Sequence, residues 1–131
     1  MNITMLGAGA WGTALAISLA QRHRVTLWAR NAEQIAGMRA TRRNERYLPE
    51  ATLPAELLLE HDLDAALAGA EMLVLAVPIS ALRATLGKIA RLPAPVPVIW
   101  LCKGFEVDTA LLPHQIADEV LPPAFPRAVL S

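Results

Sequence analysis

The sequence predicts an α/β fold with a doubly wound, mainly parallel sheet and helices on both of its faces. Strand-like and helical segments alternate along the 131 residues, as they do when helical crossovers join parallel strands. A glycine-rich turn joins the first strand to the first helix, and a later apolar run is continuous enough for a central strand buried on both faces. The length is that of one domain. We therefore expect residues 1–131 to form one dinucleotide-binding domain, for the reasons given below.

The first predicted strand covers residues 3–6 and runs directly into Gly7-Ala8-Gly9-Ala10-Trp11-Gly12. An alanine-rich helix over residues 13–20 follows. A G-x-G-x-x-G pattern between a strand and a helix is typical of a Rossmann-type fold that binds a dinucleotide. A glycine turn that holds no ligand is the alternative interpretation.

The three glycines have different tasks in such a turn. Gly7 allows the tight turn out of the strand, Gly9 lets a pyrophosphate approach the backbone, and Gly12 lets the helix pack closely on the sheet. The first N–H groups of the helix have no intrahelical partner, and its dipole is positive at this end. We therefore predict that the cofactor phosphates bind here.

The next elements are a second strand over residues 24–29, rich in β-branched and aromatic side chains, and a helix over residues 32–40 with Asn31 as its N-cap. Residues 41–54 are polar and arginine-rich at first and contain two Leu-Pro pairs, which predicts a long loop. A short third strand over residues 57–59 and a short helix over residues 62–68 follow.

The second half continues the alternation. Residues 72–77 form the continuous apolar run, which ends at Pro78, and a helix over residues 80–91 has apolar residues at helical spacing. Three prolines at 93, 95 and 97 end that helix. A fifth strand covers residues 96–101, or begins at 98 because Pro97 cannot donate to a strand ladder. A helix over residues 112–120 and a strand begun at residues 128–130 complete the pattern.

The composition argues against several classes of protein. Twelve basic and twelve acidic residues balance, so we expect no nucleic acid or anionic membrane as a partner. No apolar run approaches the roughly 20 residues of a membrane span. The chain begins with a strand at once, which predicts no export signal. The single cysteine, Cys102, cannot form an internal disulfide, so we expect a reducing compartment and a cytoplasmic protein.

Ligands of open parallel sheets bind outside the carboxyl ends of the strands. The residues that follow the predicted strands are therefore the candidates for a site. They are Gly7 to Gly12, Arg30, Pro78 to Ser80, and Lys103 to Glu106.

Arg30 bears on the choice of cofactor. In this fold an acidic residue at the end of the second strand commonly accepts the ribose 2′-hydroxyl of NAD, whereas an arginine there can pair with the 2′-phosphate of NADP. Arg30 stands at that strand end, and Glu33 comes a turn later. We predict NADP(H) as the cofactor, with NAD(H) as the alternative. A solvated arginine at a surface turn is the interpretation without a ligand.

Lys103 follows a strand and precedes a glycine, so we expect its ammonium group at the mouth of the crevice, where a phosphate or a polarised carbonyl would suit it. A solvated loop lysine is the alternative. Trp11 is either an anchor that packs the helix start or a wall of the pocket. The sequence does not separate these two interpretations.

The remaining polar side chains predict no further site. Three arginines are expected to form a solvated face, with contact to a ligand phosphate as the alternative, and three histidines show no metal-ligand spacing with Cys102. We expect these histidines at the surface and no metal site. The residues are Arg42, Arg43 and Arg46, and His23, His61 and His114.

Several segments together resemble bacterial NAD(P)-dependent glycerol-3-phosphate dehydrogenase. The glycine turn is shared with many dehydrogenases, but the aromatic residue within it, the N-x-x-Y-L-P segment and the K-G-F-E segment are specific in combination. The resemblance covers essentially the whole chain. Its segments are residues 7–16, Leu27-Trp28-Ala29-Arg30, Asn44-Glu45-Arg46-Tyr47-Leu48-Pro49, Ala76-Val77-Pro78 and Cys102-Lys103-Gly104-Phe105-Glu106.

The resemblance implies reversible hydride transfer between NAD(P)H and dihydroxyacetone phosphate, which gives sn-glycerol 3-phosphate for phospholipid synthesis. It places Ala10, Trp11 and Arg30 at the cofactor, and Lys103 at both the cofactor and the substrate. Pro78, which follows a predicted strand, is also expected to bind the cofactor. The family has a second, helical domain with a catalytic lysine, so we expect this chain to be a fragment without a catalytic residue of its own. A homodimer is the expected state of the parent enzyme.

Two other functions remain open from the sequence. One is a different reductase on the same scaffold, acting on a hydroxyacid or a sugar phosphate, although the K-G-F-E segment counts against it. The other is a non-catalytic NADP-binding sensor.

Overall fold

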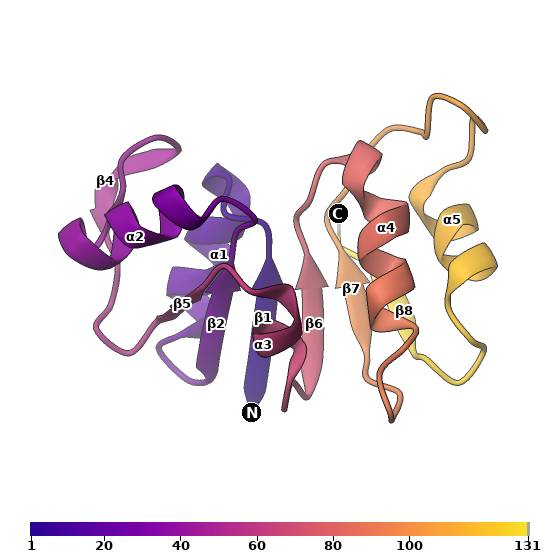
Figure 1. Cartoon of the computed structure of the whole chain (residues 1–131), viewed down its shortest axis with the longest axis horizontal. Helices are drawn as coiled ribbons and strands as arrows, with labels where there is room; N and C mark the ends of the chain where they lie inside the picture. The colour runs from indigo at the N-terminus through magenta and orange to yellow at the C-terminus, as the bar shows by residue number, and fades with distance from the viewer. Residues whose placement is uncertain (131) are drawn as a thin grey trace.

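The computed structural model describes residues 1–130 of the chain. One parallel sheet forms the centre of the molecule. Its strands lie in the order β5-β2-β1-β6-β7-β8, and every neighbouring pair is parallel (Figure 1). The strands are β1 (Asn2–Leu6), β2 (Arg24–Trp28), β5 (Leu58–Glu60), β6 (Met72–Leu75), β7 (Val98–Trp100) and β8 (Arg127–Val129). The predicted doubly wound α/β class is confirmed.

The helices pack in two apolar layers, one on each face of the sheet. They are α1 (Ala10–Leu19), α2 (Ala32–Thr41), α3 (Leu63–Leu67), α4 (Ile79–Ile89) and α5 (Pro113–Val120). Buried residues of α1 and α2 pack with Val74 of β6, whereas α3, α4 and α5 pack with Leu73 and Leu75 of the same strand. Successive side chains of a strand point to opposite faces, so β6 is buried on both sides, as its continuous apolar run predicts.

The order of the strands creates a switch point between β1 and β6. From β1 the chain moves outward through β2 to β5, returns to the centre at β6, and then moves outward in the other direction through β7 to β8. The crevice at such a reversal, beyond the carboxyl ends of the strands, is where open α/β sheets bind ligands. The glycine turn leaves β1 at this point.

The predicted loop over residues 41–54 is wrong in its central part. Two strands, β3 (Arg43–Asn44) and β4 (Leu48–Thr52), pair in an antiparallel hairpin there. Pro49 favoured the prediction of a loop, because a proline usually argues against a strand. In a two-stranded sheet each strand has a free edge, where the missing N–H group of a proline is tolerated.

Smaller differences concern where elements begin and end. Helix α1 already begins at Ala10, so the last residues of the glycine motif are its first turn. Strand β6 ends at Leu75 rather than at residue 77, and β8 covers residues 127–129. The Asn31 side chain accepts hydrogen bonds from the N–H groups of Glu33 and Gln34, which confirms it as the N-cap of α2.

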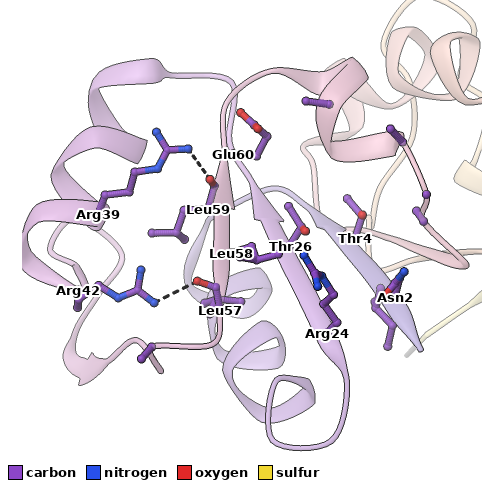
Figure 2. A pocket seen from close by; sticks show the side chains of 16 residues that line it. Asn2, Thr4, Arg24, Thr26, Arg39, Arg42, Leu57, Leu58, Leu59 and Glu60 are labelled. Atoms are coloured by element: carbon purple, nitrogen blue, oxygen red, sulfur yellow. Dashed lines mark hydrogen bonds between the residues drawn. The ribbon is translucent and has the colours of Figure 1, made fainter.

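Arg42 is not part of a solvated face, contrary to the prediction. It is half-buried, and its guanidinium donates to the carbonyl of Leu57 at 3.1 Å and also to that of Pro54. Arg39 donates to the carbonyl of Leu59 at 2.6 Å. Figure 2 shows Arg39 reaching from α2 to Leu59 of β5, and Arg42 reaching from the end of α2 to Leu57, the residue before β5. Since β5 is at the edge of the sheet, the contact of Arg39 occupies a carbonyl that would otherwise be free to pair with another strand.

The same view looks into a hollow of about 650 Å³ beside β5. Asn2 and Arg24, the first residues of β1 and β2, are among its lining residues. The hollow therefore lies toward the amino ends of the strands, away from the glycine turn.

Candidate functional site

Two glycines of the turn pack so closely that no side chain fits. Gly7 has a φ of 112°, and a Cβ atom there would lie 2.5 Å from the carbonyl oxygen of Ala76, just after β6. A Cβ on Gly12 would lie 2.1 Å from the carbonyl oxygen of Gly7. The turn out of β1, the start of α1 and the end of β6 therefore meet at backbone distance, and this contact fixes the walls of the crevice.

Gly9 differs from these two glycines. Its φ of −75° is open to any residue, and a Cβ there would meet no atom within 4 Å. The space above Gly9 is therefore open at the switch point. A side chain would enter this space, whereas glycine leaves it for a ligand that approaches the backbone.

The start of α1 offers donors to such a ligand. Gly9 is the N-cap and has no side chain to cap the helix, and the first turn contains no acidic residue. The Thr13 N–H makes the first helical bond, to the Gly9 carbonyl at 3.0 Å, so the preceding amides of Ala10, Trp11 and Gly12 lie outside the helical ladder. Exposed amides and a positive dipole end suit the pyrophosphate of a dinucleotide.

Asn44 supports the turn from the hairpin, and the sequence interpretation did not assign it this task. Only 1% of the residue is exposed, and its side-chain N–H₂ donates to the Ala8 carbonyl and to the Thr13 hydroxyl, both at 2.8 Å. Gln34 of α2 donates to the same Ala8 carbonyl at 3.3 Å. A buried polar side chain in an arginine-rich stretch gives no pattern that a sequence reading can recognise.

Arg30 lies at the carboxyl edge of the sheet, beside the glycine turn. It follows β2, and the Gly7 N–H donates to the Trp28 carbonyl at 2.9 Å, which sets the ends of β1 and β2 side by side. Arg30 is exposed and forms no ion pair with any other residue in the range 1–130. Its guanidinium is thus available to an anion.

Trp11 and Lys103 line one hollow of about 540 Å³, together with Leu15 of α1 and Leu101. Trp11 is 81% exposed, so it is a wall of this hollow and not an anchor in the core. Most of the lining is apolar, and Lys103 is the cation among the described residues that form it. Such a surface suits an apolar ring with an anionic group beside it.

Pro78 is exposed and is the N-cap of α4, directly after the Ala76–Val77 backbone that contacts Gly7. The structure thus brings Gly7, Gly9, Arg30, Pro78 and Lys103 to one edge of the sheet, as their positions after parallel strands predict.

The loop that carries Lys103 is tied to α4 by an ion pair that the sequence interpretation missed. Arg83 donates to both carboxylate oxygens of Glu106, at 3.0 Å and 3.3 Å through Nε, and Glu106 also accepts from the Thr109 hydroxyl. Arg83 and, second, Thr109 lower the pKa of the Glu106 carboxyl, because both donate to its ionised form. Glu106 is therefore occupied with Arg83.

Cys102 is buried beneath this edge, and its Sγ donates to the Val77 carbonyl at 3.0 Å. Burial raises the pKa of the thiol, which favours the unreactive protonated form. His61 and His114 are exposed, as expected, and His23 is half-buried. Within residues 1–130 no three His, Cys, Asp or Glu side chains are grouped to hold a metal ion.

The helices of the described part, residues 1–130, include none with the length and apolar character needed to cross a bilayer.

Comparisons with known proteins agree with this geometry. A family model described as the NAD-dependent glycerol-3-phosphate dehydrogenase N-terminus matches residues 2–131. The chain is 56% identical over its whole length to glycerol-3-phosphate dehydrogenase (NAD(P)+) of Thiobacillus denitrificans and 50% identical to that of Nitrosomonas europaea. It spans 40% of the length of each of these relatives.

The similarity extends to a solved structure. The crystal structure of glycerol-3-phosphate dehydrogenase from Coxiella burnetii matches 98% of this chain with a TM-score of 0.88 and 33% identity, and the match covers 39% of that protein. This chain therefore belongs to the family of NAD-dependent glycerol-3-phosphate dehydrogenases, in the region that its family model describes as the N-terminus.

Proposed function

We propose that this chain is the cofactor-binding part of an NAD(P)-dependent dehydrogenase that interconverts dihydroxyacetone phosphate and sn-glycerol 3-phosphate. The observation that carries the proposal is the open space above Gly9 at the start of α1, at the switch point of the sheet. The family match over residues 2–131 supports the substrate. It also counts against a hydroxyacid or sugar-phosphate reductase as the alternative.

The residues at the edge of the sheet divide the binding task. The amides of Ala10, Trp11 and Gly12 would hold the pyrophosphate, and Trp11 and Pro78 would border the remainder of the cofactor. When bound, the nicotinamide would accept or supply hydride. Lys103 would face the negative charge of the substrate or cofactor from the wall of the apolar hollow.

Arg30 supports a preference for NADP(H) over NAD(H). It stands at the end of β2, the position from which side chains reach the ribose 2′ substituent in this fold, and its guanidinium is exposed. A planar guanidinium suits a phosphate through paired, charge-assisted hydrogen bonds.

The general acid of the reaction belongs, in this proposal, to the part of the relatives that lies beyond the matched 40%. Reduction of a ketone builds negative charge on its oxygen, and a proton donor within hydrogen-bond reach must neutralise that charge. Lys103 would act as an electrostatic partner of the substrate. The family resemblance also supports a role in phospholipid precursor synthesis in the cytoplasm and a homodimeric parent enzyme.

Steady-state kinetics on the full-length protein that contains this chain would test the proposal. The ketone panel would contain dihydroxyacetone phosphate, a 2-ketoacid and a six-carbon ketose phosphate, and NADPH oxidation would be followed by nicotinamide absorbance. We expect dihydroxyacetone phosphate to have the highest kcat/KM by several decades. A higher value for another ketone would support a different reductase. Tight NADPH binding without turnover of any ketone would support a sensor.

A further inference from the structure

The peptide plane between Ala8 and Gly9 can adopt two orientations, and the conformational freedom of glycine permits both. Rotation of this peptide plane by about half a turn would change the φ of Gly9 from its present −75° to a positive value, which glycine adopts at little energetic cost. Another residue would resist that rotation. Gly9 must nevertheless have no side chain if a ligand is to approach, so some other group has to fix the peptide.

The two orientations present opposite charges to a ligand. The peptide is planar and trans, so the Ala8 carbonyl and the Gly9 N–H point in opposite directions. In the structure the carbonyl points to Asn44 and Gln34, and the N–H therefore points away from them. A rotated peptide would exchange the two groups. Under the proposed function the Gly9 N–H joins the amides that face the pyrophosphate, and a carbonyl oxygen in its place would repel the phosphate.

We propose that Asn44, assisted by Gln34, is a positioning residue that holds the Ala8–Gly9 peptide in the orientation that binds phosphate. This inference rests on the proposed function, namely that the glycine turn binds NADP(H). Neither side chain is placed in contact with the cofactor. Both act through the Ala8 carbonyl, which they hold with two hydrogen bonds from separate elements, at 2.8 Å from β3 and 3.3 Å from α2.

The chemistry of Asn44 suits this task. Its amide has two N–H bonds, which are used by the Ala8 carbonyl and the Thr13 hydroxyl, while its Oδ1 accepts from the Tyr47 N–H at 3.4 Å. The partners at both ends fix which atom is nitrogen. With 1% of the residue exposed, water does not offer replacement bonds. Asn44 therefore joins the turn, the first turn of α1 and the hairpin in one rigid unit.

Asn44→Asp is the sharpest variant, because it keeps the shape and removes both N–H donors. At neutral pH its carboxylate would face the Ala8 carbonyl and repel it, which favours the rotated peptide. We expect NADP+ to bind at least tenfold more weakly than to the unmodified chain at pH 8, on the scale of one hydrogen bond to a charged group. At lower pH the protonated carboxyl can donate one bond again, so the ratio of the two dissociation constants should fall.

Thr4→Val is the matched control. The buried Thr4 hydroxyl donates to the Ala66 carbonyl at 2.7 Å, so this variant also removes a buried hydrogen bond to a backbone carbonyl, but on the face of the sheet that α3 covers. We expect a lower urea midpoint with unchanged affinity for NADP+.

Gln34→Met is a second test variant. Gln34 is half-buried, so its replacement should not disturb the core, and the variant should bind NADP+ several-fold more weakly than the unmodified chain.

Calorimetric titration with NADP+ at pH 8 and pH 5.5, together with urea unfolding of each variant, distinguishes the outcomes. Absence of binding to the unmodified chain would contradict the proposed function. If the unmodified chain binds NADP+ and the Asn44→Asp variant binds it with equal affinity at pH 8, this inference alone would be overturned. A loss in Thr4→Val as large as that in Asn44→Asp would also overturn it. Should Asn44→Asp not fold, unchanged affinity in Gln34→Met would overturn the joint role of the two side chains.

Discussion

We expect the same substitution to have different effects at Gly9 and at Gly12, although both glycines belong to one motif. A Cβ at residue 9 would meet no atom within 4 Å and needs no unusual φ, so we expect a Gly9→Val domain to stay folded while the side chain blocks the approach of the pyrophosphate. Valine at residue 12 would collide with the Gly7 carbonyl, since even its Cβ would be 2.1 Å away. We expect Gly9→Val to abolish NADPH binding with little change in thermal unfolding, and Gly12→Val to lower the unfolding temperature strongly.

Circular dichroism on heating, with NADPH titration of the same samples, would measure both effects. A folded Gly9→Val variant that binds NADPH normally would show that the pyrophosphate does not approach this backbone.

Arg30→Asp should narrow or reverse the preference for NADPH over NADH. It would remove the proposed charge-assisted hydrogen bond to the 2′-phosphate, which is worth about 1.5–3 kcal/mol, or one to two decades in affinity. It would also place a carboxylate where it could accept a hydrogen bond from the ribose hydroxyl of NADH. Arg24→Asp makes the same charge change at the amino end of β2, beside the other hollow, and is the control. Titrations with both cofactors give the ratio of affinities. If the ratio of NADPH to NADH affinity is the same before and after Arg30→Asp, Arg30 does not bind the 2′-phosphate.

At the scale of elements, the ion pair between Arg83 of α4 and Glu106 holds the loop that carries Lys103. The pKa of Glu106 is lowered in the folded protein, so its contribution to stability is present above the ordinary glutamate pKa and is lost as the pH falls through the lowered value. Glu106→Gln should therefore lower the urea midpoint at pH 7, and its difference from the unmodified chain should narrow on acidification.

Glu119→Gln is the control for this prediction. Glu119 also bonds Arg83, but its side chain is 53% exposed, compared with 17% for Glu106, so water screens its contact more strongly. Its effect at pH 7 should be smaller. A gap between Glu106→Gln and the unmodified chain that stays constant from pH 7 to pH 3 would contradict the assigned pKa shift.

The elements also differ in how far their sequences predict them. The apolar run of β6 and the N-cap Asn31 are local patterns with a local physical cause, and both are found as expected. The hairpin β3–β4 has no such pattern. Its Asn44 is buried because the Ala8 carbonyl and the Thr13 hydroxyl, more than 30 residues earlier, need donors there. The role of Arg42 likewise depends on carbonyls near β5.

At the scale of the whole molecule, we expect the 131-residue chain alone to bind NADPH and to reduce no dihydroxyacetone phosphate. The amides of Ala10, Trp11 and Gly12 that are proposed to bind phosphate lie within this chain, but the relatives have more than half of their length outside the matched region. Loss of general acid catalysis typically lowers a rate by about 10² to 10⁴, and loss of substrate positioning lowers it further.

NADPH oxidation by this chain and by the full-length protein, at matched cofactor occupancy, is the measurement. The Gly9→Val variant of the full-length protein serves as the control for cofactor-dependent absorbance change. Turnover by the chain within about tenfold of the full-length protein would place the proton donor inside residues 1–131.

The sequence by itself determined the fold class, the glycine turn and the edge of the sheet where the candidate residues meet. It could do so because strand and helix periodicity is local, and because parallel strands bring their carboxyl ends to one edge whatever their order. Only the tertiary structure decided that Gly9 faces open space while Gly12 does not, that Trp11 is a wall rather than an anchor, and that Asn44 holds the turn. Each of these depends on which atoms from distant segments lie within a few ångströms of one another. Such contacts produce no local sequence pattern that could predict them.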